Sequence, residues 1–123
     1  MNSKVKDIET VYSRLSKQLH NGNMLHMEHE LETSVKNYSL AKFVLGKGNR
    51  YKALISAGIH GDEPSGVETI CSFLENNRFE NFSDTWELTI LPCLNPYGYE
   101  YGVRENHRGE DLNRFFSQDS PAE

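Results

Sequence analysis

The stretch "HGDE" at residues 60–63 brings together side chains that bind divalent metal ions. His60 offers an imidazole nitrogen and Glu63 a carboxylate, and Gly61 between them permits a sharp turn of the backbone. Zinc accepts nitrogen and oxygen ligands, and a catalytic zinc ion usually takes three protein ligands and one water molecule. The pattern indicates two of those three ligands. It is also compatible with a simpler role, because acidic residues here would stabilise the first turn of a following helix.

A second polar cluster lies at 94–116, in "LNPYGYEYGVRENHRGEDLNRFF", and contains Arg104, Arg108, Asn113 and Arg114. A guanidinium group is a rigid fork of donors that binds a carboxylate through two hydrogen bonds. Two arginines and an asparagine beside a metal ion would fix an acidic substrate and polarise its carbonyl group. Any single arginine is more often a solvated surface residue. The Asn-Arg pair, however, stands between apolar residues, which indicates that packing holds it in place.

Apolar patterning predicts the elements that carry these clusters. It favours an amphipathic helix over 5–19, an exposed strand over 24–31, a strand over 38–48, a strand buried on both faces over 52–59, a helix from Pro64 to about Arg78, and a strand over 86–94. A strand, a helix and a strand in succession predict a parallel pairing. Each polar cluster directly follows a strand, and ligands bind beyond the carboxyl ends of strands in such sheets.

The composition indicates an ordinary globular protein, expected to form a single domain over residues 1–123. The formal charge of −5 gives no electrostatic reason to expect nucleic acid or an anionic membrane as a partner. No apolar run approaches the ~18 residues of a membrane span, and the first residues carry charges where a secretory signal would be apolar. A cytoplasmic location is therefore expected. Cys71 and Cys93 stand in apolar surroundings and are expected in the core, not in a disulfide or a metal site.

Taken together and in this order, "HGDE", "NPYG", "VRENHRG" and "DLNRFF" resemble the motifs of zinc carboxypeptidases, and more weakly those of the related succinylglutamate desuccinylase and aspartoacylase enzymes. The match covers residues 53–116. The resemblance implies an α/β fold, namely a three-layer α/β/α domain with a mostly parallel mixed sheet. These 123 residues would form its N-terminal part, and the domain would therefore be incomplete.

Carried over by position, the resemblance implies that His60 and Glu63 are ligands of Zn²⁺. It implies that Asn113 and Arg114 bind the terminal carboxylate of the substrate. Arg104 most nearly takes the place of the arginine that stabilises the oxyanion, and Arg108 is the competing assignment because the spacing through "RENHRG" is not decisive. A third zinc ligand and a general base, which the family takes from later in the domain, are not found in this sequence.

The function implied is zinc-dependent hydrolysis of the C-terminal peptide bond of a peptide, by a metallocarboxypeptidase. The alternative within enzymes is an amidohydrolase acting on N-acyl amino acids, since the same zinc and arginine groups serve both. The alternative outside enzymes is a non-catalytic module that binds an anionic terminus. His107, the one histidine after His60, is expected to pack within its loop and not to bind metal.

Overall fold

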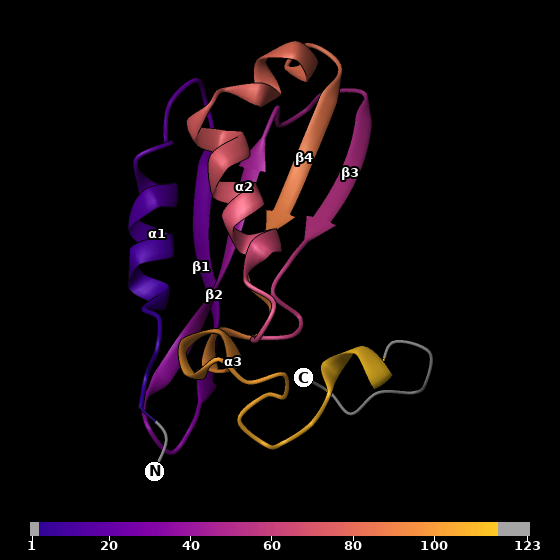
Figure 1. The fold of residues 1–123 in the computed structure, drawn as a ribbon. Helices are drawn as coiled ribbons and strands as arrows, with labels where there is room; N and C mark the ends of the chain where they lie inside the picture. Colours follow the sequence, from indigo (N-terminus) through magenta and orange to yellow (C-terminus); the bar gives the residue numbers. More distant parts are fainter. Residues whose placement is uncertain (1–2, 116–123) are drawn as a thin grey trace.

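The computed structural model describes residues 3–115. Its elements in chain order are α1 (Ile8–Ser16), β1 (Met24–Glu32), β2 (Asn37–Leu45), β3 (Tyr51–Ser56), α2 (Ser65–Glu75), the 3-10 turn η1 (Arg78–Phe82), β4 (Trp86–Leu91), α3 (Pro96–Tyr101) and the 3-10 turn η2 (Leu112–Phe115). Figure 1 shows the helices α1 and α2 in front of the strands and α3 below them. Within these residues no helix is both long and apolar enough to cross a membrane.

The four strands form one mixed sheet in the order β1-β2-β4-β3. The α/β class expected from the sequence is confirmed. The parallel component is smaller than expected for this part of the chain, because β1 with β2 and β2 with β4 pair antiparallel and only β3 with β4 pairs parallel. The connections explain this. A short turn between β1 and β2 leaves only an antiparallel pairing, whereas the α2 crossover carries the chain back to start β4 alongside β3.

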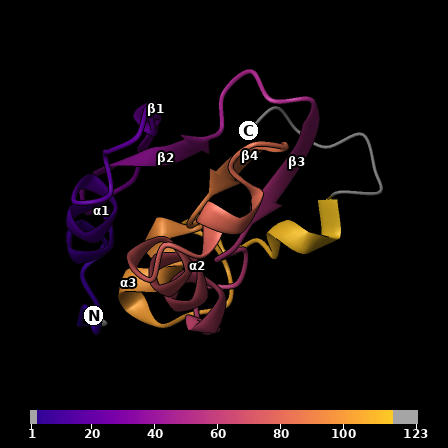
Figure 2. The ribbon, with the colours of Figure 1, turned by 90° about the horizontal axis from the view of Figure 1, so that it is seen from above.

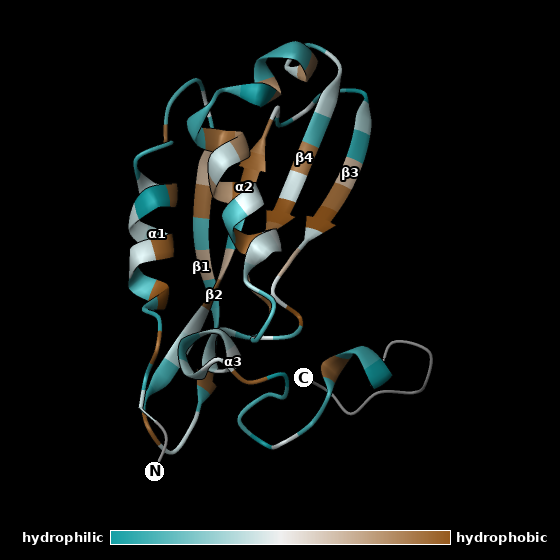
Figure 3. Cartoon of the chain, viewed as in Figure 1, coloured by the Kyte–Doolittle hydropathy of each residue, from teal (hydrophilic) through white to brown (hydrophobic). Residues whose placement is uncertain are grey.

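Helices α1 and α2 cover one face of the sheet, as the view from above shows (Figure 2). Asp7 caps helix α1, and its side chain accepts a hydrogen bond from the Glu9 amide at 2.9 Å. The hydrophobic stripes of the two helices face the strands (Figure 3). The resulting core includes the following buried residues: Ile8, Val11, Leu15, Phe43, Leu45, Val67, Ile70, Leu74, Leu88 and Ile90. Cys71 and Cys93 are free thiols within this core, which confirms their predicted role.

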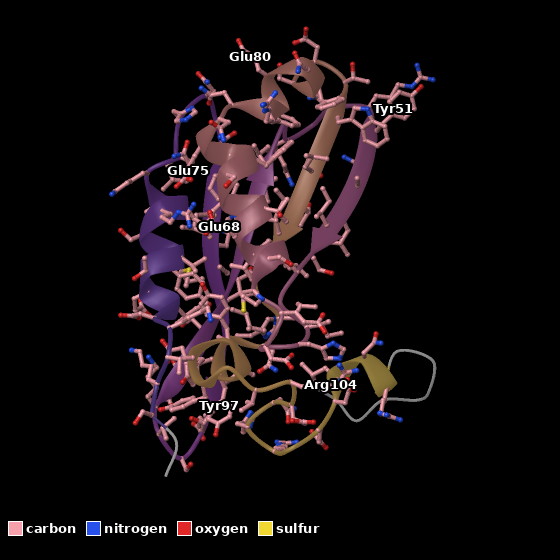
Figure 4. The ribbon with its side chains drawn as sticks, in the orientation of Figure 1. Tyr51, Glu68, Glu75, Glu80, Tyr97 and Arg104 are labelled. Carbon is pink, nitrogen blue, oxygen red and sulfur yellow. The ribbon has the colours of Figure 1, made fainter. Side chains whose placement is uncertain are left out.

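Arg14 joins α1 to α2. Its guanidinium forms two hydrogen bonds with Glu68 at 2.7 Å each, and two with Glu75 at 2.7 and 2.8 Å. Both glutamates lie on the side of α2 that faces α1 (Figure 4). Hydrogen bonds from Arg14 lower the pKa of each carboxyl group below its ordinary value. These paired hydrogen bonds therefore fix the position of α1 relative to α2.

The strand β3 differs from its prediction, because it is an edge strand with most residues exposed and not a strand buried on both faces. Leu54 is 68% exposed and Ile55 is 39% exposed. The cause is that β3 pairs with β4 on one side only, and the helices of residues 3–115 cover just the face to which α1 and α2 pack. The third layer implied by the family resemblance is thus absent from the described residues.

Glu100 on α3 has a fully buried carboxylate that ties the N-terminal segment to the rest of the fold. It accepts hydrogen bonds from the Ile8 amide at 2.8 Å and the Tyr38 hydroxyl at 2.9 Å, and it lies 3.1 Å from the Lys36 ammonium. Burial alone would raise the pKa of Glu100, but the hydrogen bonds from Ile8, Lys36 and Tyr38 outweigh burial and lower that pKa below its ordinary value of 4.5. The carboxylate is therefore held in its charged form.

We expect Glu100→Gln to reduce the free energy of unfolding at neutral pH by about 1–3 kcal/mol, because it removes a charged acceptor and leaves buried donors poorly paired. Since folding lowers this pKa, the contribution of Glu100 is complete above pH 4.5 and is lost as the pH falls through the folded-state value. Urea unfolding over a pH series measures both effects. Glu32→Gln, at an exposed strand end, is the control. The free energies of unfolding of wild type and Glu100→Gln should converge as the pH falls below 4.5. A constant difference between them would contradict the lowered pKa of Glu100.

Candidate metal centre and anion-binding loop

The two polar clusters meet because the parallel pairing of β3 with β4 continues beyond both strands. The Ala57 amide donates to the Leu91 carbonyl at 3.0 Å, the Leu94 amide to the Ala57 carbonyl at 2.9 Å, and the Asn95 amide to the Gly58 carbonyl at 2.9 Å. In Figure 3 the arrows of both strands end in apolar residues, and the chain beyond β3 stays pale to apolar before it becomes hydrophilic. The segment before His60 therefore lies beside the segment that begins α3.

Two glycines allow the His60 loop to approach α3 at backbone distance. A β-carbon added at Gly61 would overlap the backbone of Gly98 on α3. The chain then turns, with the Glu63 amide donating to the His60 carbonyl at 3.2 Å, and enters α2 through Pro64. Gly61 is therefore required for the close approach to Gly98, whereas the turn does not depend on it because its φ is not positive.

His60 and Glu63 point toward each other. The Nδ1 atom of His60 lies 3.7 Å from Oε2 of Glu63, and the imidazole is buried with 8% of its surface exposed, while Glu63 is 62% exposed. Two ligand atoms on one tetrahedral zinc ion are about 3.4 Å apart, given bond lengths near 2.0–2.1 Å. The separation of the two side-chain atoms thus matches that of atoms sharing a metal ion.

Asp111 organises the site from the opposite side of the imidazole. One oxygen accepts from His60 Nε2 at 2.9 Å and from the Asn113 amide at 3.0 Å. The other accepts from Arg104 Nε at 3.2 Å and lies 3.6 Å from Arg114 Nε. The hydrogen bond with His60, together with those from Asn113 and Arg104, lowers the pKa of Asp111 below its ordinary value, against the effect of burial. Asp111 is consequently an ionised acceptor.

The ionised carboxylate of Asp111 assigns the tautomer of His60. A carboxylate has no proton to give, so His60 Nε2 carries the hydrogen of the 2.9 Å bond. In the neutral imidazole the lone pair of Nδ1 then faces the carboxylate of Glu63. Two electron-rich atoms facing each other favour a cation between them, and a metal-binding histidine typically donates its second ring N–H to a carboxylate. The donor set therefore fits a divalent metal ion.

The two arginines that could stabilise the oxyanion, Arg104 and Arg108, lie in different places. Arg104 reaches the centre, with Nη1 lying 3.8 Å from Glu63 Oε2 in addition to its contact with Asp111 (Figure 4). Arg108 lies instead on an exposed turn, where its amide donates to the Asn106 side chain at 2.9 Å, and its guanidinium makes no hydrogen bond or ion pair with the described residues. Position therefore favours Arg104.

The predicted carboxylate-binding residues lie on the 3-10 turn η2, directly after Asp111. Asn113 is exposed, and Arg114 is 81% exposed beside Asp111. His107 packs edge-on against the Tyr97 ring, with centroids 6.3 Å apart, which agrees with its predicted place in the loop. Within residues 3–115 no third histidine, cysteine or carboxylate completes a metal site with His60 and Glu63.

Asp111 is the site residue that sequence reasoning missed. The pattern of residues does not single it out within "DLNRFF", where it precedes the Asn-Arg pair by two residues. The available signal was chemical: a proposed histidine ligand needs a carboxylate or carbonyl partner for its other nitrogen. Nothing local in the sequence indicated which of the nearby acidic residues would supply it.

Comparison with solved structures shows the fold first. The chain shares its α/β fold with solved metallo-carboxypeptidases, including one from Burkholderia cenocepacia with a TM-score of 0.74, 20% sequence identity, and coverage of 91% of this chain and 33% of that chain. A candidate metallopeptidase from Shewanella amazonensis is 29% identical, with a TM-score of 0.69 and coverage of 85% of this chain and 39% of that chain.

The sequence comparisons then specify the family. Residues 49–122 match the succinylglutamate desuccinylase/aspartoacylase catalytic domain, and the chain belongs to that family. Murein peptide amidase A of Escherichia coli is 38% identical over 68 residues, which are 55% of this chain and 26% of the amidase. The chain thus spans about a quarter of the length of this curated relative.

The contact between Gly61 and Gly98 leads to a test. We expect Gly61→Ala to lower the free energy of unfolding by about 1–3 kcal/mol or more, because the added methyl group forces two backbone segments apart. Gly66→Ala is the matched control, since its methyl group would face only the Ala57 side chain at 3.2 Å and alanine favours the helix. Urea unfolding of both variants decides the point; equal stabilities would show that the contact is not tightly packed.

Proposed function

We propose that this chain carries the metal-binding and substrate-carboxylate-binding part of a zinc-dependent hydrolase that cleaves an amide bond in a peptide substrate. The observation that carries the proposal is the arrangement around His60, with Asp111 bonded to Nε2 and Glu63 facing Nδ1. His60 and Glu63 would hold the ion. When bound, Zn²⁺ supplies a Lewis acid and lowers the pKa of a bound water toward ~7.

The residues around this pair support distinct roles in the reaction. Asp111 keeps the imidazole of His60 in the orientation and tautomer of a ligand. Arg104 is proposed to donate hydrogen bonds to the oxygen that gains negative charge, which a well-placed donor can stabilise by about 3–4 kcal/mol. Asn113 and Arg114 are proposed to bind the free carboxylate of the substrate, because both are exposed on η2 beside Asp111.

The substrate class is proposed from the relatives. Family membership supports hydrolysis of an amide bond, and the similarity to a murein peptide amidase supports a peptide as the substrate. A metallocarboxypeptidase acting on the C-terminal peptide bond is one form of this activity. The second candidate is an amidohydrolase of N-acyl amino acids, which the desuccinylase/aspartoacylase family match favours. Both substrate classes present a carboxylate near the scissile amide, and the exposed Arg114 would bind that carboxylate.

Metal binding is the first test. We expect the protein to bind Zn²⁺, and we expect His60→Ala and Glu63→Gln each to reduce its affinity at least tenfold, because each removes a ligand. Asp111→Asn should reduce the affinity about 10- to 100-fold through loss of the histidine partner. Isothermal titration calorimetry measures these values. His26→Ala, on the exposed strand β1, is the control. Unchanged affinity in His60→Ala would exclude the proposed centre.

Turnover is the second test, made with zinc-loaded protein expressed from its complete open reading frame. Peptides with a free C-terminus, their amides, and N-acyl amino acids form the substrate panel. We expect Arg104→Lys to lower kcat about a hundredfold or more, because lysine cannot reproduce the guanidinium geometry. Arg108→Lys should change it little. Turnover of N-acyl amino acids alone would select the second candidate, and stoichiometric binding of anions without turnover or zinc would select a non-catalytic module.

A further inference from the structure

Asn95 is a buried polar residue that the proposed mechanism leaves without a role. It is only 2% exposed and stands at the N-terminus of α3. Its Oδ1 atom accepts from the Gly98 amide at 2.9 Å. Its Nδ2 atom donates to the Glu105 carbonyl at 3.0 Å and lies 3.4 and 3.5 Å from the carbonyl oxygens of Arg104 and Ile59. One side chain thus contacts three separate backbone segments.

The segments that Asn95 contacts are those that carry the site. Ile59 immediately precedes His60, and Glu105 immediately follows Arg104. The backbone of Asn95 adds a further link, because its amide donates to the Gly58 carbonyl at 2.9 Å. The side chain of Asn95 therefore lies between the segment that carries the proposed metal ligand and the segment that carries the proposed oxyanion donor.

The chemistry of the contacts requires an amide. A carboxamide offers an acceptor to the helix amide and, at the same time, two N–H donors to the carbonyl oxygens. An aspartate would keep the acceptor but turn a negative oxygen toward the carbonyls of Ile59, Arg104 and Glu105. A serine would keep a capping oxygen but is too short to reach the same carbonyls. Because the site is buried, either change leaves carbonyl groups without their donor.

We propose that Asn95 is a positioning residue that fixes the spacing between the His60–Glu63 pair and Arg104. The inference rests on the proposed function, since it assigns a spacing between a metal ligand and an oxyanion donor. Asn95 contacts neither group through its side chain. It acts through the backbone on both sides of the site, and it is distinct from a cap that serves only the stability of α3.

Asn49 provides a matched control at the opposite end of the sheet. Its Nδ2 atom also donates to two backbone carbonyls, those of Ser83 at 2.6 Å and Trp86 at 3.0 Å, and it also joins segments distant in sequence. Asn49→Asp therefore removes a comparable pair of hydrogen bonds. It lies away from His60 and Arg104, so it reports the effect of lost stability alone.

The experiment compares Asn95→Asp, Asn95→Ser and Asn49→Asp in three measurements: the melting temperature, Zn²⁺ affinity by calorimetry, and the ¹⁵N chemical shifts of the His60 ring in metal-free protein. We expect all three variants to melt at lower temperature. We expect Zn²⁺ affinity to fall about 10- to 100-fold in both Asn95 variants, as for other residues that orient a ligand, and less than about twofold in Asn49→Asp. The His60 shifts should change only in the Asn95 variants.

The inference would be overturned by wild-type His60 shifts in folded Asn95 variants, or by an equal loss of affinity in Asn49→Asp. Global unfolding of both Asn95 variants would also overturn it, because Asn95 would then serve the stability of the whole fold. Failure of the proposed function has a different signature. Wild-type protein would bind no Zn²⁺, while the metal-free shifts of His60 would still report whether Asn95 sets its surroundings.

Discussion

The parallel pairing of β3 with β4 is the constraint on which the candidate site depends. Two strands that run in the same direction end at the same edge, so the loops that follow them meet even though α2 and η1 separate them in sequence. Hydrogen bonds beyond the strands extend the pairing as far as Gly58 and Asn95. An antiparallel pair would place the two loops at opposite ends of the sheet. The polar clusters would then have no common surface.

The charges at this edge are balanced around Asp111. Its carboxylate contacts an imidazole and two guanidinium groups, so one partly buried anion orients both the proposed ligand and the proposed anion-binding groups. The arginines remain accessible despite these contacts, since Arg104 is 45% exposed and Arg114 is 81% exposed. Each retains N–H donors beyond its contact with Asp111 and, for Arg104, the further contact with Glu63 at 3.8 Å. The same carboxylate thus fixes the arginine side chains without using up their capacity to bind substrate.

Local pattern predicted the elements well, because helical periodicity and strand alternation are properties of short segments. It predicted the edge at which His60 and Arg104 lie because the polar cluster of each comes after a strand, although the helix α3, which was not predicted, stands between β4 and Arg104. It did not predict Asp111 or the choice between Arg104 and Arg108. Those depend on how the chain folds back after α3, where a turn stabilised by the Asn106 side chain directs Arg108 away. The burial of β3 was predicted wrongly because apolar composition does not say which polypeptide covers a strand.

The two proposed ligands differ in how firmly the fold holds them, and this difference bears on metal affinity. His60 is 8% exposed and fixed by Asp111, whereas Glu63 is 62% exposed and its carboxylate lies beyond hydrogen-bond distance of the imidazole. Ordering a long exposed side chain on a cation costs conformational entropy, of order 1–2 kcal/mol for glutamate. The imidazole of His60 is already ordered by burial and by its hydrogen bond with Asp111, so it loses little further conformational entropy when it binds a metal ion. Metal binding by these residues should therefore depend first on the preorganised histidine, with the glutamate closing on the ion once it is present.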